Sequence, residues 1–399
     1  MTARRQRKVL IAGLGVAGAT RAWWLTEYGF EVTVVERAPA PRTEGYMIDF
    51  WGLGYEVAER MGVLGDLRAL GYLIDEIRLV KADGGRLATI GAQAVRRAMG
   101  DRFFSLMRGD LAGELHRQIA GRAEIRFDDA IRTLDQQGDG VEVEFERGAA
   151  ATYDLVFGAD GVHSACRTAI FPEPCESPLG LWTASFAADA YPKRDPGAYV
   201  SFTEVGRQVA RYALRGERSA FFFVFRAPEG ESAPPHGLLQ QKLCLRRVFG
   251  GAWECLDIFE RLDAQPELYF DSVDQVRAPA WSRGRVALVG DAAACPSLLA
   301  GEGASLAMAG AYVLAGELSR CGDDHAGAFE RYERLLRPVV EQKQKGALRL
   351  AGWFAPKTAF GLHVRNGLSR LAAAPGFSAL LIGDMLASGI ELPDYGRSG

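Results

Sequence analysis

Cysteine and histidine are scarce in this sequence. Its 399 residues include six cysteines and five histidines, and no two cysteines form a Cys-x-x-Cys pair. The chain also lacks His-Glu-x-x-His and Gly-x-Ser-x-Gly. We therefore expect scattered reduced thiols, no metal site, and neither zinc-protease nor typical serine-hydrolase chemistry.

Excess charge and long apolar runs are missing as well. A net charge of −3 argues against a nucleic-acid partner, which would need a basic face. No apolar run approaches the roughly 20 residues of a membrane span. The basic stretch Arg4–Lys8 precedes an apolar run, as in a signal peptide, but cleavage there would destroy the glycine motif described next. We expect a cytoplasmic protein without membrane contact, and a monomer.

A strand, a glycine turn and a helix open the chain. Residues 8–12 are an apolar run, 19–28 are predicted to form a helix, and 31–36 form a second strand. The turn has the form Gly-x-Gly-x-x-Gly, and an acidic residue closes the second strand, where it would hold ribose hydroxyls. This unit predicts dinucleotide binding without distinguishing FAD from NAD, through Gly13, Gly15, Val16, Ala17, Gly18, Glu36 and Arg37.

Two further motifs each follow an apolar strand. Asp160 lies in Gly158-Ala159-Asp160-Gly161, and Asp291 lies in Gly290-Asp291-Ala292. Each aspartate is either a ligand-binding residue at the edge of a parallel sheet or an ordinary turn or helix-capping residue. After the second motif come glycines that open a helix over 304–319, whose N-terminus would favour an anionic ligand.

The middle of the chain changes character after Pro172. Residues 181–190, 199–205, 208–215 and 220–226 are predicted to be consecutive strands of an antiparallel meander. A long charged helix over 329–350 follows later, with Pro338 as a possible kink. The tail over 361–387 is predicted to be helical.

The three motifs resemble those of the single-component FAD-dependent aromatic hydroxylases of the para-hydroxybenzoate hydroxylase type, also called group A flavin monooxygenases. Within that family the chain looks closest to the tetracycline-inactivating and antibiotic-tailoring enzymes. The resemblance implies an α/β fold with a Rossmann-like FAD-binding domain of the glutathione-reductase type, an inserted antiparallel-sheet substrate domain, and C-terminal helices. It places the FAD-binding domain at 1–75, 100–178 and 271–335, the substrate domain at 76–99 and 179–270, and the bridging helices at 336–399.

The resemblance also assigns roles. The Asp-Gly motif would serve the FAD pyrophosphate and NAD(P)H, and the Gly-Asp motif the ribityl chain. It adds to the FAD-binding set the residues Arg42, Arg108, Asp160, Asp291, Gly301, Gly303, Ala304 and Ser305. One departure is clear, because Leu298 stands where the family usually has proline.

Candidate substrate contacts come from the meander and from segments beside the flavin. The phenylalanines at 221–225 alternate faces, so half of them would line a pocket. The expected contacts are Tyr46, Met47, Asp49, Arg211, Phe221, Phe223, Leu298, Glu302 and Trp353. Phe354 is expected to close the site together with Trp353, near the end of the long helix.

The expected activity is an NAD(P)H- and O2-dependent monooxygenase that hydroxylates a bulky aromatic or polyketide-like molecule through a flavin C4a-hydroperoxide. The flavin carries the chemistry, so no protein nucleophile or general base is expected. The altered Leu298 loop motivates one alternative, an FAD-containing [4+2] cyclase that performs no redox step. A flavin halogenase and a non-enzymatic FAD-binding sensor are less favoured, because the halogenase Trp-x-Trp-x-Ile-Pro segment is absent and the meander suggests a substrate pocket.

Overall fold

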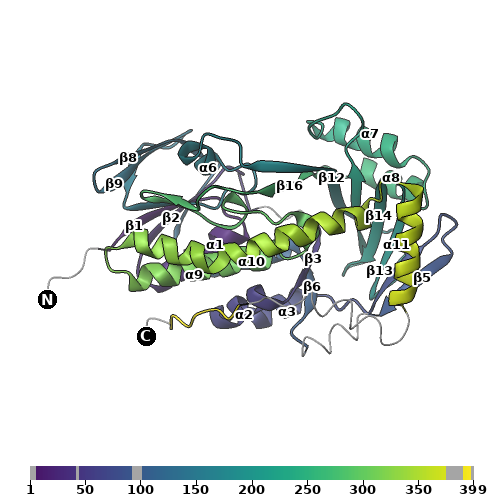
Figure 1. Ribbon diagram of the computed structural model, residues 1–399, viewed down its shortest axis with the longest axis horizontal. Coiled ribbons are helices and arrows are strands. Elements are labelled where there is room, and N and C mark those ends of the chain that lie inside the picture. The colour runs from purple at the N-terminus through teal and green to yellow at the C-terminus, as the bar shows by residue number, and fades with distance from the viewer. Residues whose placement is uncertain (1–5, 42–44, 92–100, 374–389, 397–399) are drawn as a thin grey trace.

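A computed structural model describes residues 6–41, 45–91, 101–373 and 390–396 (Figure 1). Arg42, residues 92–99 of the expected substrate domain, and residues 374–387 of the expected helical tail lie outside the described residues. Within the described part of the chain, no helix is both long enough and apolar enough to cross a membrane.

A six-stranded sheet forms one half of the molecule. Its order is β17 (Ser282–Arg283), β18 (Val286–Leu288), β11 (Leu155–Gly158), β1 (Lys8–Ala12), β2 (Glu31–Glu36) and β7 (Glu124–Phe127). All neighbours are parallel except β17 and β18. The central strands are almost wholly buried, as expected for parallel strands covered on both faces.

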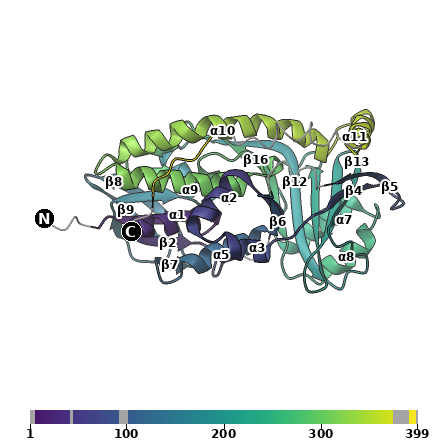
Figure 2. The same ribbon diagram turned by 90° about the horizontal axis from the view of Figure 1, so that it is seen from below.

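Helices pack around this sheet. They include α1 (Val16–Glu27), α5 (Arg108–Ile119), α9 (Gly303–Arg320) and α10 (His325–Phe354). In Figures 1 and 2, α10 runs the length of the molecule, from α9 to the second sheet. It is one continuous helix with Pro338 inside it.

The second sheet has seven strands and lies at the other end of the molecule. Its order is β16 (Tyr269–Val276), β12 (Glu176–Asp189), β15 (Arg218–Arg226), β14 (Arg207–Ala213), β13 (Ala198–Glu204), β4 (Glu76–Val80) and β5 (Arg86–Gly91). The four predicted meander strands are present as β12 to β15. Sequence reasoning missed α7 (Leu238–Phe249) and α8 (Cys255–Asp263), which cover the outer face of this sheet.

Shorter elements complete the fold. A two-stranded sheet joins β3 (Met47–Phe50) to β6 (Phe104–Met107), and a three-stranded sheet has the order β10 (Ala151–Tyr153), β9 (Gly140–Phe145), β8 (Ile131–Gln137). The remaining described helices are α2 (Gly52–Met61), α3 (Leu64–Leu70), α6 (Ala165–Ile170) and α11 (Ala359–Ala372), with 3-10 turns η1 (Gly290–Ala292) and η2 (Leu298–Ala300). The predicted fold class is confirmed, and the residue ranges assigned to the two domains stay a prediction.

One buried side chain in α1 is poorly matched to its surroundings. Arg21 is fully buried, its guanidinium carbon lies 3.6 Å from the centroid of the Phe157 ring, and none of its nitrogens has a hydrogen-bond partner in the described structure. Burial lowers its pKa to about 9. A buried charge without a polar partner costs free energy that ring stacking offsets only in part.

We expect Arg21→Met to raise the free energy of unfolding by about 1–4 kcal/mol, the range seen when buried charges are replaced by apolar side chains. Urea denaturation monitored by circular dichroism measures this. Arg167→Met is the matched control: Arg167 is also buried, but it donates to Ala292 O at 3.1 Å and pairs with Glu176. That substitution should destabilise the protein by about 1–3 kcal/mol, because it removes the donor to the buried Ala292 carbonyl and the partner of Glu176. Equal effects of the two substitutions would contradict this reading of Arg21.

Candidate cofactor and substrate site

The three sequence motifs meet at one edge of the parallel sheet. Strands β1, β11 and β18 are neighbours, and their ends are level, because Ala12 pairs with Gly158 and Gly158 pairs with Leu288. The loops that follow therefore leave the sheet at the same edge, where open α/β folds bind their ligands.

The first turn leaves backbone exposed to a cavity. Gly13 has φ +97°, and a Cβ there would lie 2.5 Å from Ala159 O. A Cβ on Gly18 would lie 1.9 Å from Gly13 O, so this glycine lets the helix approach the turn. At Gly15, in contrast, a Cβ would meet no atom within 4 Å, and no side chain caps α1 at this residue. The helix N-terminus is thus open to an anionic group.

Glu36 is fixed by backbone amides. Its carboxylate accepts hydrogen bonds from Leu14 N at 2.7 Å and from Ala38 N at 2.9 Å. The side chain is buried yet lines the same cavity as Gly15. A carboxylate oxygen can accept more than one hydrogen bond, so Glu36 can also hold ribose hydroxyls.

The sequence left Asp160 as either a ligand-binding residue or a turn or helix-capping residue, and its surroundings fit both interpretations. It accepts hydrogen bonds from Ser164 Oγ at 2.5 Å and Cys166 N at 3.1 Å, which stabilise the start of α6. It also lines the cavity. Its first role is therefore to hold the loop after β11 in place.

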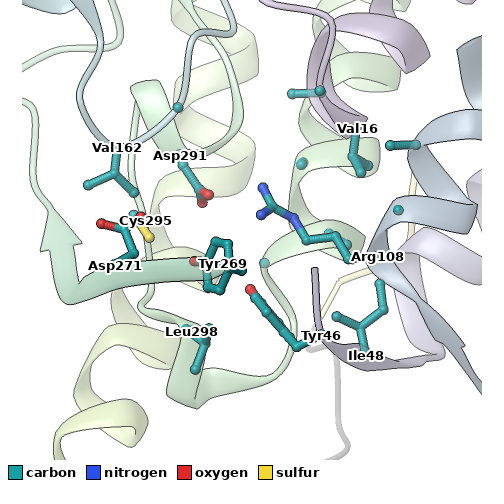
Figure 3. A pocket seen from close by; sticks show the side chains of 18 of the residues that line it. Val16, Tyr46, Ile48, Arg108, Val162, Tyr269, Asp271, Asp291, Cys295 and Leu298 are labelled. Atoms are coloured by element: carbon teal, nitrogen blue, oxygen red, sulfur yellow. The ribbon is translucent and has the colours of Figure 1, made fainter. Parts of the chain in front are cut away.

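Asp291 and Arg108 face one another across the cavity (Figure 3). Burial raises the pKa of Asp291, while the Arg108 guanidinium and a hydrogen bond from the Cys295 thiol act in the opposite direction. The pKa of Arg108 is raised, chiefly by Tyr46. A ligand between these two side chains would meet a cation on one side and an acceptor on the other.

The loop before α9 forms the next wall of the cavity. Ser297 has φ +91° and Gly301 has φ +70°, and these frame the 3-10 turn η2. Leu298, Gly301, Gly303 and Ala304 line the cavity. Leu298 lies below Tyr269 in Figure 3, so the residue that replaces the family's proline does face the site.

Apart from Gly18 and Gly158, the motif residues described above line one cavity of about 1160 Å³. That volume exceeds the roughly 300–1,000 Å³ of ordinary ligand pockets, which suits a long cofactor together with a substrate. At one end lie the glycine turn, Glu36 and Arg37; the other end lies under the seven-stranded sheet. The open backbone at Gly15 and the acceptor at Glu36 fit the phosphate and ribose of FAD.

Aromatic side chains line the far end of the cavity. Tyr46 lies with its ring centroid 5.7 Å from that of Phe222 and 5.4 Å from that of Tyr269. Tyr212 stacks on Tyr199 at 5.9 Å, and the Tyr212 hydroxyl accepts a hydrogen bond from Met47 N at 2.7 Å. Such walls suit a planar, largely apolar ligand.

A carboxylate interrupts this apolar lining. Asp49, on β3, is open to the cavity and accepts a hydrogen bond from Ser105 Oγ at 2.5 Å. Burial within the surrounding protein raises the pKa of Asp49. It gives the aromatic end of the cavity, called the chamber below, an acceptor for a hydrogen-bond donor.

The structure corrects the expectation for Phe221, Phe223 and Arg211. The two phenylalanines point away from the cavity into the layer formed with α7 and α8. In that layer the ring centroid of Phe223 lies 5.0 Å from that of Phe249. Arg211 pairs with Phe221 across the strands and shares that face, where it binds Asp195 and Glu254 at 2.7 Å. The phenylalanine at the cavity is the intervening Phe222.

Four more expected contacts lie beside the cavity without lining it. Phe354 reaches the cavity in place of Trp353, whose carbonyl accepts from Arg365. Ser305 donates to Trp51 O at 3.1 Å and so joins α9 to the segment before α2. Glu302 pairs with Lys343, and Gly18 packs α1 on its turn. Of the two neighbouring residues expected to close the site, it is therefore Phe354 that lines the cavity. Sequence reasoning missed Tyr199, Tyr212 and Tyr269, although Tyr212 and Phe222 follow the two-residue alternation of their strands.

The opposite orientation of Phe222 and Phe223 on β15 can be tested by substitution. Phe222→Ala should weaken binding of an aromatic ligand while leaving FAD bound, because it enlarges the cavity. Phe223→Ala should instead cost about 3–5 kcal/mol of stability, the usual effect of truncating a core phenylalanine. Ligand titration by flavin fluorescence and urea denaturation separate the two effects. The assignment is wrong if Phe223→Ala alters ligand affinity more than Phe222→Ala does.

A parallel α/β sheet with a dinucleotide turn, a carboxylate for ribose and a second, aromatic chamber defines an FAD-binding oxidoreductase. Comparisons with known proteins agree. The FAD binding domain family matches residues 6–185. A protein named flavin-dependent monooxygenase, from an unknown prokaryotic organism, is 32% identical, with 98% of this chain and 99% of that protein covered.

Two further known proteins are similar to this chain over most of its length. The FAD-dependent monooxygenase asL4 of Sarocladium schorii is 30% identical, with 92% of this chain and 93% of that protein covered. The crystal structure of tetracycline destructase Tet(55) is 32% identical with a TM-score of 0.81, covering 98% of this chain and 99% of that one. This chain belongs to the flavin-dependent monooxygenases, and it is an FAD-binding enzyme.

Proposed function

We propose that this monooxygenase takes electrons from NAD(P)H and inserts one oxygen atom of O2 into a bulky aromatic or polyketide-like small molecule. One observation carries the proposal: a single cavity joins the nucleotide end, at Gly15 and Glu36, to a chamber walled by Tyr46, Tyr212 and Phe222. Cofactor and substrate would therefore meet without leaving the protein.

The chain's own residues would divide the work of holding FAD. The α1 N-terminus would bind the pyrophosphate, Glu36 the ribose, and Asp291 the ribityl hydroxyls. Gly303 and Ala304, at the start of α9, would face the anionic end of the reduced ring system. Bound FAD supplies the transfer of two electrons and the activation of oxygen, and the route through its C4a atom remains part of this proposal.

The aromatic chamber would orient the substrate and exclude water. Tyr46 has its pKa raised to about 12 by burial, so its hydroxyl stays protonated near neutral pH and can donate a hydrogen bond. The likeness to tetracycline destructase Tet(55) supports a polycyclic substrate, and tetracycline itself is a suitable first probe.

A stopped-flow experiment tests the activity. FAD-loaded protein is mixed anaerobically with NADH or NADPH, with and without tetracycline or a polycyclic phenol, and then exposed to O2. We expect bleaching of the flavin absorbance, faster with a true substrate, and one labelled oxygen in the product from ¹⁸O2. A product formed at unchanged mass with no flavin bleaching would overturn the proposal in favour of the redox-neutral [4+2] cyclase. The names of the relatives do not favour that alternative.

A further inference from the structure

A buried ion pair lies directly behind the cavity wall. Glu302 stands between Gly301 and Gly303, which both line the cavity, and it occupies the N-cap position of α9. Its carboxylate lies 2.6 Å from Nζ of Lys343 on α10, and the two side chains are only 9% and 13% exposed. The pair is thus held in a region of low dielectric constant.

The position of Glu302 makes its charge consequential. The N-terminus of α9 carries a partial positive charge that favours an anion in the cavity. A carboxylate at the same point opposes that field, and Lys343 cancels the carboxylate. Hydride transfer from NAD(P)H to FAD adds two electrons and one proton and leaves NAD(P)⁺, so the reduced cofactor carries one more negative charge than the oxidised one.

We propose that Lys343 is a positioning residue that neutralises Glu302 and thereby keeps the reduction potential of the bound FAD high enough for NAD(P)H to reduce it. The inference rests on the proposed function only for the placement of the flavin beside α9. It assigns an electrostatic role to the middle of α10, a helix that does not touch the cavity at this point.

A purely mechanical role is the competing explanation. Helix α10 also holds the loop through Gln344, whose side-chain amide donates to Cys295 O at 3.0 Å and Val276 O at 2.8 Å. Gln344 is uncharged and buried next to Lys343 in sequence. Gln344→Met therefore loosens the same loop without changing charge, and it is the matched control.

The surroundings of Glu302 determine how the effect varies with pH. Burial raises its pKa, while Lys343 and a hydrogen bond from Trp51 lower it. Other charged groups near this end of α9 include Asp291, whose Oδ1 lies 4.0 Å from the Cβ position of Gly303, and Arg108 and Asp271, which both act on Asp291. Without Lys343, Glu302 would take up a proton at low pH and be neutral, and it would carry an unpaired charge only at high pH.

The test is a reductive titration of the FAD-loaded full chain with dithionite and reference dyes, from pH 6 to pH 9, without substrate or oxygen. For Lys343→Met we expect about tenfold less reduced flavin at a fixed potential at pH 9, which is about 30 mV for a two-electron couple. The shift should fade toward pH 6. Glu302→Gln should shift the potential in the positive direction, and the double variant should titrate like the unaltered protein.

Several results would overturn the inference. They are an unchanged potential in both single variants, or a shift of equal size and sign in Gln344→Met and Lys343→Met. If Lys343→Met does not retain FAD, Glu302→Gln alone decides the matter by the direction of its shift. Because the readout is the potential of bound flavin, a protein that binds FAD but hydroxylates nothing refutes the proposed function and still tests this inference.

Discussion

Replacing Gly15 with valine gives a folded protein that no longer holds FAD. The backbone at Gly15 has φ −72°, which valine can adopt, and a Cβ there meets no protein atom within 4 Å. The new side chain would project where the pyrophosphate must approach the helix N-terminus. We expect FAD affinity to fall by at least about 100-fold, which is about 2.8 kcal/mol of binding free energy.

Flavin absorbance after gel filtration and isothermal titration with FAD measure this loss. Gly346→Val is the matched control: Gly346 is exposed on α10, and a Cβ there meets nothing within 4 Å. That variant should retain one FAD per chain. Gly18→Val should behave differently from both, because a Cβ would lie 1.9 Å from Gly13 O and the turn itself must distort. Stoichiometric FAD in Gly15→Val would refute the placement of the pyrophosphate.

The second large effect concerns Asp291. Asp291→Ala removes a carboxylate that faces the cavity opposite Arg108, so FAD should bind about 10- to 150-fold more weakly, the value of a hydrogen bond to a charged group. The cofactor-free protein should not lose stability, because burial raises the pKa of this carboxyl and its charged form is costly without a ligand.

FAD titration and thermal unfolding of the cofactor-free form separate these two effects. Asp257→Ala is the control, because Asp257 lies half-exposed on α8, where it pairs with Lys193. Asp257→Ala should leave the FAD affinity and the cavity unchanged. Full FAD occupancy in Asp291→Ala would show that the third motif does not hold the cofactor.

Local patterns in the sequence predicted the nucleotide end well. A buried strand, the turn Gly-x-Gly-x-x-Gly and a helix together are typical of a dinucleotide-binding unit. The glycines are needed in this turn because a Cβ at Gly13 or Gly18 would collide with nearby backbone. The edge location of Asp160 and Asp291 followed because parallel strands end at the same edge of a sheet. The role of Asp160 in starting α6 could not be separated from ligand binding by sequence alone.

The substrate end was harder to predict, and α7 and α8 explain why. Alternation along 220–226 shows that Phe222 and Phe223 face opposite ways, but it does not say which face is the cavity. That depends on which layer packs on which side. The helices over 238–263 cover the face that holds Phe223 and Arg211, and this leaves Phe222 and Tyr212 for the cavity.

The sequence by itself determined the class of cofactor site, because its turns, strands and glycine positions are set by contacts within short segments. Only the tertiary structure decided which aromatic side chains wall the chamber, and that Lys343 neutralises Glu302 from a helix 41 positions further along the chain. Those features arise from packing between distant segments, where the free energy of burial, rather than local backbone preference, selects the partner.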